Sequence, residues 1–297
     1  MRLCNRTAFA AILAGTALLL PAQQSPGFNV QIPVGVTDRD NRPAIGLKRD
    51  NFLILENGKK QQISTVEGED TPVSIGILVD LSGSMAPKLA GERTAILQFI
   101  SSANPQDEFF LVGFNEQPEL IADFTSSRDE IEAGLANVKT GHRKALLDAI
   151  EFGLEKMKGA HNQRKVLLVI SNGADNFSHH SEGEMRAAIR KSDVEVFSIG
   201  IFNAYAPTPE ERVGPQLLSN ISGESGGLLF RLDDLGDAGP VAETISSLLR
   251  HQYVIRYVSG DLAHDGKWRK VKVRVNPPPG LSPLTVYARS GYYAPLQ

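Results

Sequence analysis

Apolar runs alternate with amphipathic stretches in a regular order between residues 71 and 251. The run Val166-Leu167-Leu168-Val169-Ile170 contains no polar residue, which is expected of a strand that helices cover on both faces. Candidate strands occupy residues 73–79, 109–114, 120–124, 166–170, 195–201 and 228–232. Candidate helices occupy residues 88–102, 128–138, 145–158, 182–191, 209–221 and 239–251. This alternation predicts an α/β fold with a doubly wound, mostly parallel sheet.

The two ends of the chain have the period-two pattern of β-strands. In residues 23–70, apolar side chains alternate from Val30 to Val36, and the segment as a whole predicts two or three short strands. In residues 252–297, strands are predicted at 253–258, 268–275 and 284–288, and the β-like segment ends with Gly291-Tyr292-Tyr293. Neither end is large enough to bury a core alone. We therefore expect the two ends to pair into one small β module that flanks the α/β domain.

The first 22 residues have the organisation of a secretory signal peptide. Arg2 and Arg6 precede an apolar stretch from Ala8 to Leu20, and Leu20-Pro21-Ala22 offers a cleavage site. The stretch is short for a helix that spans a bilayer. The sequence predicts cleavage near Ala22, a secreted or periplasmic product, and no transmembrane segment in the mature chain.

The composition is that of a globular protein, with 297 residues, 41% of them hydrophobic, and 31 Lys+Arg against 34 Asp+Glu. A formal charge of -3 provides no broad positive field, so nucleic acid is not expected as a partner. The single cysteine, Cys4, lies in the predicted signal peptide. Disulfides are therefore not expected to stabilise the mature protein.

The first strand of the α/β region leads into a polar loop, Asp80-Leu81-Ser82-Gly83-Ser84. Ligands of open α/β sheets bind at the carboxyl ends of strands, so a binding site is expected here. An Asp-x-Ser-x-Ser loop between a buried strand and a helix resembles the signature of von Willebrand factor A (VWFA) domains, and the resemblance covers residues 71–251. The whole chain also resembles the exported VWFA-related proteins typical of acidobacteria, through Leu55-Glu56-Asn57-Gly58 and Gly291-Tyr292-Tyr293-Ala294.

The resemblance implies a metal-ion-dependent adhesion site (MIDAS). In the family, one loop provides an Asp and two Ser oxygens, a second loop provides a Thr hydroxyl, and a third provides an Asp. Together they hold Mg²⁺ or Mn²⁺, and an acidic side chain of the partner completes the metal's shell. Mg²⁺ requires octahedral oxygen ligands and tolerates water or a partner in the open positions. Asp80, Ser82 and Ser84 match the first loop residue for residue.

The other two loops depart from the family pattern. Lys144 stands where the resemblance places the metal-binding Thr, in Lys144-Ala145-Leu146-Leu147-Asp148. Asn172 stands where it places the acidic ligand, and Asp175 follows in the same loop. An added ammonium and a lost carboxylate change the local charge by about two units. We hypothesise that the Lys144 side chain occupies the metal position, where Asp80, Ser82 and Ser84 accept its hydrogen bonds.

Two alternatives remain open from the sequence. Thr140, four residues before Lys144, provides the hydroxyl ligand if the second loop is shifted. Alternatively, Lys144 points to solvent, as lysines in the first turn of a helix commonly do. In the second case a weakened site would persist, with Mg²⁺ or Mn²⁺ held by Asp80, Ser82 and Ser84.

The sequence offers no catalytic constellation. Neither Ser82 nor Ser84 lies in a G-x-S-x-G nucleophile elbow, and the phosphate-binding and H-E-x-x-H motifs are absent. His179 and His180 have no third ligand at metal-site spacing. The sequence therefore predicts an exported, non-enzymatic, adhesion-type protein with a degenerate MIDAS and no cofactor, which binds another protein through an acidic side chain of that partner. The alternative to a binding protein is a structural component of the envelope with a vestigial site.

Overall fold

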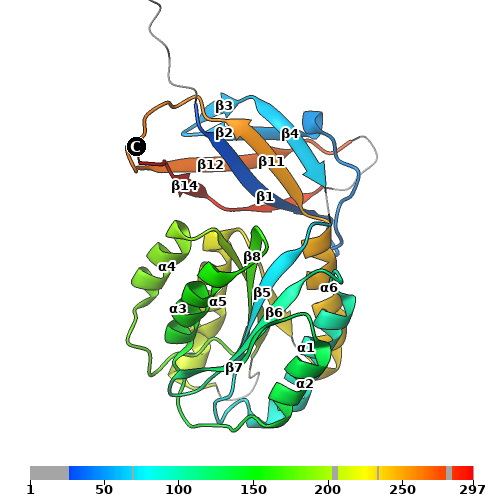
Figure 1. Ribbon diagram of the computed structural model, residues 1–297, viewed down its shortest axis with the longest axis vertical. Helices are drawn as coiled ribbons and strands as arrows, with labels where there is room; N and C mark the ends of the chain where they lie inside the picture. The colour runs from blue at the N-terminus through cyan, green and yellow to red at the C-terminus, as the bar shows by residue number, and fades with distance from the viewer. Residues whose placement is uncertain (1–26, 69, 203–206, 233, 279–282, 297) are drawn as a thin grey trace, which may run out of the picture.

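The computed structural model describes residues 27–68, 70–202, 207–232, 234–278 and 283–296. The predicted signal peptide, residues 1–22, lies outside them. Figure 1 shows two parts stacked along the long axis of the molecule, a β sandwich and a helix-flanked sheet. The chain passes from the sandwich into the helical part and returns to the sandwich near its end.

A six-stranded sheet forms the centre of the α/β domain. In spatial order its strands are β10 (Leu229–Leu232), β9 (Val194–Ile201), β8 (Arg164–Ser171), β5 (Val73–Asp80), β6 (Glu108–Phe114) and β7 (Pro118–Thr125). All neighbouring strands are parallel except β6 and β7, which are antiparallel. Every residue of β5 is buried, as expected of a central strand covered on both faces. The prediction of a mostly parallel, doubly wound sheet is confirmed.

Helices cover the two faces of this sheet in two separate layers (Figure 1). One layer consists of α1 (Leu89–Ser102), α2 (Arg128–Ala136) and α6 (Ala238–Arg250). The other consists of α3 (Leu146–Lys156), α4 (Glu182–Lys191) and α5 (Pro209–Ser225). Short 3-10 turns add η1 (Arg49–Asn51), η2 (Ala86–Lys88), η3 (Met157–Gly159) and η4 (Leu235–Asp237).

Local sequence explains where several of these helices begin and end. Ser127, Ser181 and Thr208 accept hydrogen bonds from backbone N–H groups in the first turns of α2, α4 and α5. Helix α5 runs four residues past its predicted end at Ile221 and stops at Gly226, whose φ of 93° suits glycine. The sequence prediction ended this helix too early because the polar residues after Ile221 carry no apolar period.

The β module is a sandwich of two four-stranded sheets, each built from both ends of the chain. One sheet has the order β13 (Thr285–Ala288), β1 (Asn29–Thr37), β11 (Tyr253–Val258) and β4 (Ile63–Gly68). The other has the order β14 (Gly291–Tyr293), β12 (Trp268–Val275), β2 (Phe52–Glu56) and β3 (Lys59–Gln61). Buried side chains such as Ile32, Ile54 and Tyr257 fill the space between the sheets.

The pairing of the two ends agrees with the prediction, but the number of strands does not. The N-terminal segment contains four strands, β1 to β4, where two or three were expected. Strand β3, Lys59-Lys60-Gln61, is short and mostly exposed, so its residues do not produce an alternating apolar pattern.

The connections between the two parts determine where a binding site can lie. Strand β5 starts five residues after β4 of the sandwich, so the amino ends of the parallel strands face the sandwich. Their carboxyl ends, which carry the Asp80 loop, lie at the far end of the molecule (Figure 1). Within the described part of the chain, no helix is both long and apolar enough to cross a membrane.

Candidate functional site

Asp80 is the last residue of β5, and its side chain is completely buried. The Ser171 hydroxyl donates a hydrogen bond to Asp80 Oδ2 (2.6 Å), and the backbone N–H of Ser82 donates to Oδ1 (3.0 Å). Ser171 is the last residue of β8, the strand paired with β5. The parallel pairing therefore brings both side chains to the same edge, where the two bonds fix the carboxylate.

The Lys144 side chain lies beside this carboxylate and is 6% exposed. Its Nζ donates a hydrogen bond to Asn172 Oδ1 (2.5 Å) and lies 3.7 Å from Asp80 Oδ2. Burial lowers the pKa of Lys144 below its usual value, while the charges of Asp80 and Glu211 oppose this shift. The alternative in which Lys144 points to solvent is wrong.

Lys144 is held in this position by its backbone as well. Its N–H donates to Asn176 Oδ1 (3.0 Å), and its carbonyl accepts from the N–H groups of Asn176 (3.1 Å) and Phe177 (3.0 Å). Three hydrogen bonds of the Lys144 backbone thus join the second loop to the third, and they restrict where the ammonium can lie.

Asn172 connects three elements at the site. Its Oδ1 accepts from Lys144, and its Nδ2 donates to Glu211 Oε1 (2.9 Å) and to Ser84 Oγ (3.3 Å). Glu211 lies in the first turn of α5, where it forms a capping box with Thr208. A neutral amide suits this position because it donates to a carboxylate on one side and accepts from an ammonium on the other.

The remaining residues of the first two loops lie close by. The Ser82 hydroxyl is buried and forms no hydrogen bond with any residue that the structure describes, so the expectation that it accepts a hydrogen bond from Lys144 is wrong; the ammonium donates to Asn172 instead. Ser82 pairs with Gly141 in an isolated β-bridge, so the second loop runs beside the first. Thr140, next to Gly141, is exposed, and among the described residues its hydroxyl has no hydrogen bond to Asp80, Ser82 or Ser84.

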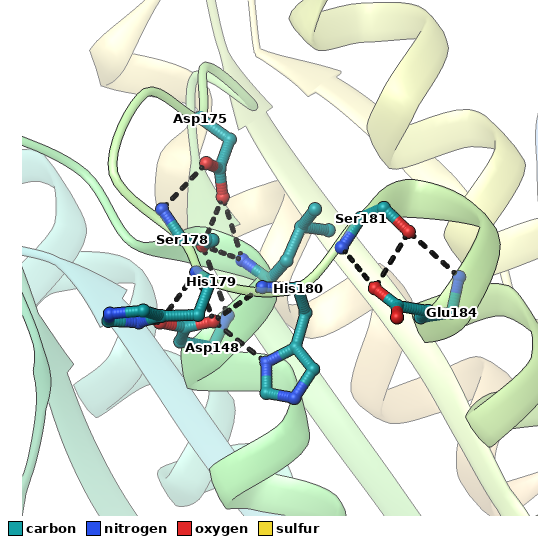
Figure 2. Close-up of polar contacts among 8 residues, drawn as sticks. Asp148, Asp175, Ser178, His179, His180, Ser181 and Glu184 are labelled. Carbon is teal, nitrogen blue, oxygen red and sulfur yellow. Dashed lines mark hydrogen bonds and ion pairs between the residues drawn. The ribbon is translucent and has the colours of Figure 1, made fainter.

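Asp175 binds the amino end of α3, and Figure 2 shows its carboxylate beside Ser178. Its Oδ2 accepts from the backbone N–H of Leu147 (2.9 Å) and from the Ser178 hydroxyl (2.5 Å). The residue before α3, Ala145, has no side chain that can cap the helix. Asp175 and Ser178 of the third loop therefore accept hydrogen bonds from the N–H groups in its first turn.

Asp148 binds the same loop further along its course (Figure 2). Its carboxylate accepts from the backbone N–H groups of His179 and His180 and lies 2.8 Å from Nδ1 of each imidazole. Burial opposes ionisation of Asp148, but these hydrogen bonds outweigh it and hold its pKa at about 2. Among the described residues no group of three or more His, Cys, Asp or Glu side chains could hold a metal ion.

Glu92, a charged residue on the apolar face of α1, lies near the site and was not predicted from the sequence. Glu92 is 1% exposed, and neither of its carboxylate oxygens has a hydrogen-bond partner among the described residues. Burial raises the pKa of Glu92 well above its usual value, and the nearby charge of Asp80 adds to this shift. The signal was present, since Ala95, Ile96 and Phe99 follow Glu92 at helical spacing and are buried.

A parallel α/β sheet with helices on both faces and an Asp-x-Ser-x-Ser loop at its carboxyl edge defines a class of interaction domain. The family model for the von Willebrand factor type A domain matches residues 74–244, more than half of the chain. The chain therefore belongs to the von Willebrand factor type A family, whose domains are generally non-catalytic adhesion or interaction domains that mediate protein–protein contacts. No curated protein matches the sequence at a significant level.

Solved structures with the same fold cover different shares of the chain. A von Willebrand factor type A protein from Catenulispora acidiphila has 12% identity and a TM-score of 0.52, covering 94% of this chain and 76% of its own. Proximal thread matrix protein 1 from the mussel byssus, in a form with a zinc-occupied MIDAS motif, has 15% identity and a TM-score of 0.53, and the match covers 66% of this chain and 50% of that protein. The vWF domain of the type V pili tip protein Mfa5 from Porphyromonas gingivalis has 9% identity and a TM-score of 0.50, and the match covers 59% of this chain and 94% of that domain. At these identities the likeness concerns the fold alone.

Proposed function

We propose that this chain is an exported, non-enzymatic A-domain protein that binds another protein, and that the Lys144 ammonium takes the place of the family's metal ion. The observation that carries the proposal is the position of Lys144 Nζ, 2.5 Å from Asn172 Oδ1 and 3.7 Å from Asp80 Oδ2. Membership of a family whose domains are generally adhesion or interaction domains supports the binding role.

Charge supports the replacement of the metal. Asp80 is the one carboxylate of the three-loop pattern that keeps its place, since Asn172 is neutral and Asp175 binds the end of α3. A divalent ion about 4 Å from an ammonium would be repelled by about 8 kcal/mol at an effective dielectric near 20. The donor set with Lys144 in place therefore does not fit Mg²⁺ or Mn²⁺, which need several oxygen ligands.

The binding surface would lie on the exposed rim of the site. Lys144 Nζ is buried, so an acidic side chain of a partner would reach the exposed Arg143 next to it in the sequence more easily than the ammonium itself. The guanidinium of Arg143 lies over the ring of Phe177 at 4.7 Å, and Phe177 is 38% exposed. An exposed arginine beside an aromatic ring is typical of residues enriched at protein interfaces.

A weakened metal site is the second candidate, and one observation favours it. The Ser82 hydroxyl and the Glu92 carboxylate are both buried without hydrogen-bond partners among the described residues. Buried polar groups normally have partners, so an ion or a water near them would supply what the side chains lack.

Partner capture at different metal concentrations tests the binding role. The immobilised chain is exposed to envelope extract with and without a chelator, and the proposal predicts that retention of the bound protein is unchanged by the chelator. The variant Arg143→Ser with Phe177→Ser should lose this retention, whereas Lys59→Ser on the distant β3 should not. Retention that survives the rim variant would favour a structural component with a vestigial site, and loss with the chelator would favour the weakened metal site.

A further inference from the structure

A cavity of about 470 Å³ lies between the β sandwich and the amino ends of the parallel strands, at the end of the domain opposite Asp80. Gln31 of β1 and Arg289, just after β13, line it from the sandwich. Arg164 at the start of β8 and Glu195 in β9 line it from the α/β domain. Cavities between domains are common positions for small-molecule sites, and this volume is within their usual range.

Glu195 is an acid without a matching cation in this cavity. It is 6% exposed, and its Oε1 accepts a hydrogen bond from Gln252 Nε2 (3.0 Å). No Lys, Arg or His of the described residues forms an ion pair with it. Burial raises the pKa of Glu195 to about 6, although the charges of Arg164 and Arg289 partly offset this. A buried carboxylate in this state is stabilised by any cation that reaches it.

Two guanidinium groups line the same cavity and lack a carboxylate partner among the described residues. Arg289 Nη2 donates to the carbonyl oxygens of Ser192 (2.7 Å) and Arg190 (3.4 Å) at the end of α4. Arg164 Nη2 donates to the carbonyl of Leu249 (2.8 Å) and to Gln252 Oε1 (2.6 Å). The Nε–H of each arginine has no acceptor in the described part of the chain.

The other charges of the cavity cancel one another. Lys165 Nζ lies 3.1 Å from Asp193 Oδ2, and both residues line the cavity. Capping of the carboxyl ends of α4 and α6 explains the bonds of the two arginines to carbonyl oxygens, but it does not explain why an acid is buried beside them. The cavity thus has both an unpaired positive and an unpaired negative group.

We propose that this cavity binds a small zwitterion of the α-amino acid class, with its carboxylate at Arg289 and its ammonium at Glu195. A simple anion would meet the Arg289 guanidinium but would be repelled by Glu195, and a simple amine would face the opposite problem. A zwitterion satisfies both groups, and its two charge-assisted contacts would join the sandwich to the α/β domain.

The preference among three kinds of probe tests the proposal in the unmodified protein. Thermal unfolding is measured near pH 7 with each of the twenty amino acids, and the best ligand is then titrated by calorimetry beside acetate and methylammonium. At least one amino acid should raise the unfolding temperature and bind saturably, and neither single-charge probe should do so at the same concentration. The absence of a shift with all twenty, or binding of acetate or methylammonium as tight as that of the amino acid, would overturn the proposal.

Variants then assign the contacts. Glu195→Gln and Arg289→Gln should each weaken the binding about tenfold or more. Glu155→Gln and Lys158→Gln, which change the same charges at an exposed ion pair outside this cavity, should leave it unchanged. Unaltered affinity in both cavity variants would contradict the assignment, and if either variant fails to fold, the comparison of probes in the unmodified protein still decides.

Discussion

Removing the Lys144 ammonium should destabilise the protein strongly, because it leaves the Asp80 carboxylate buried without a cation. In Lys144→Met the side chain keeps a similar length, so the change isolates the charge and its hydrogen bond to Asn172. The two side chains are 6% and 0% exposed, and the ion-pair distance is 3.7 Å. At an effective dielectric near 20 this corresponds to about 4 kcal/mol of attraction, within the loss of about 3–5 kcal/mol typical of breaking a buried pair from one side.

Lys156→Met is the matched control for this experiment. Lys156 Nζ lies 2.6 Å from Asp123 Oδ1, a shorter distance than that of the buried pair, but the side chains are 24% and 65% exposed. Exposed pairs contribute only about 0–1 kcal/mol. If burial governs the effect, the longer ion pair costs more to break than the shorter one.

Urea unfolding measures both losses. Far-UV circular dichroism follows the helices of the α/β domain, and fluorescence of the single tryptophan, Trp268 in β12, follows the sandwich. In Lys144→Met combined with Asp80→Asn the two effects should be less than additive, because neither buried charge is then left alone. Equal losses in Lys144→Met and Lys156→Met, or full additivity in the double variant, would show that burial of the Asp80–Lys144 pair does not govern the effect.

Three further changes test the loops that support the site. The hydrogen bond to Asp148 raises the pKa of His180. The stabilisation of the fold by protonated His180 is therefore complete below the unfolded pKa of about 6.5 and is lost as the pH rises through the folded pKa. His180→Gln should lower the urea midpoint more near pH 5.5 than near pH 8.5, and an equal loss at both pH values would contradict this. Ser181→Ala removes the capping box of α4 and should cost about 1 kcal/mol in urea unfolding, against no change for the exposed Ser219→Ala. Gly173 has φ +74° and its added Cβ would meet the Gly214 carbonyl, so Gly173→Ala should cost about 1–3 kcal/mol, whereas Gly183→Ala, in open space in α4, should not destabilise.

The parts of the fold that follow from local pattern were predictable from the sequence. The uninterrupted apolar run of β8 and the helical spacing in α1 each reflect burial of one element, so they are visible without knowledge of neighbours. Strand β3 was missed because an edge strand with Lys59 and Lys60 exposed needs no apolar residues there. Its pairing with β2 becomes evident only in the folded module.

The candidate site was predictable only in part. The position of Asp80 follows from the motif at the end of a buried strand, and the substitution at Lys144 follows from resemblance to the family. The hydrogen bonds that Ser171 and Glu211 provide depend on which strands are neighbours and on where α5 begins. These contacts depend on tertiary structure and cannot be predicted from the spacing of residues along the chain.

Restoring the family's residues shows whether the Lys144 ammonium has replaced a metal ion. In the variant Lys144→Thr with Asn172→Asp, the hydroxyl and the carboxylate return and the ammonium is removed. Calorimetric titration with Mg²⁺ or Mn²⁺ up to about 1 mM should give saturable binding in this variant and none in the unmodified protein. Lys139→Thr with Asn137→Asp makes the same change of charge at exposed positions and should not gain binding. Saturable binding of either ion by the unmodified protein, abolished by Asp80→Ala, would contradict the claim.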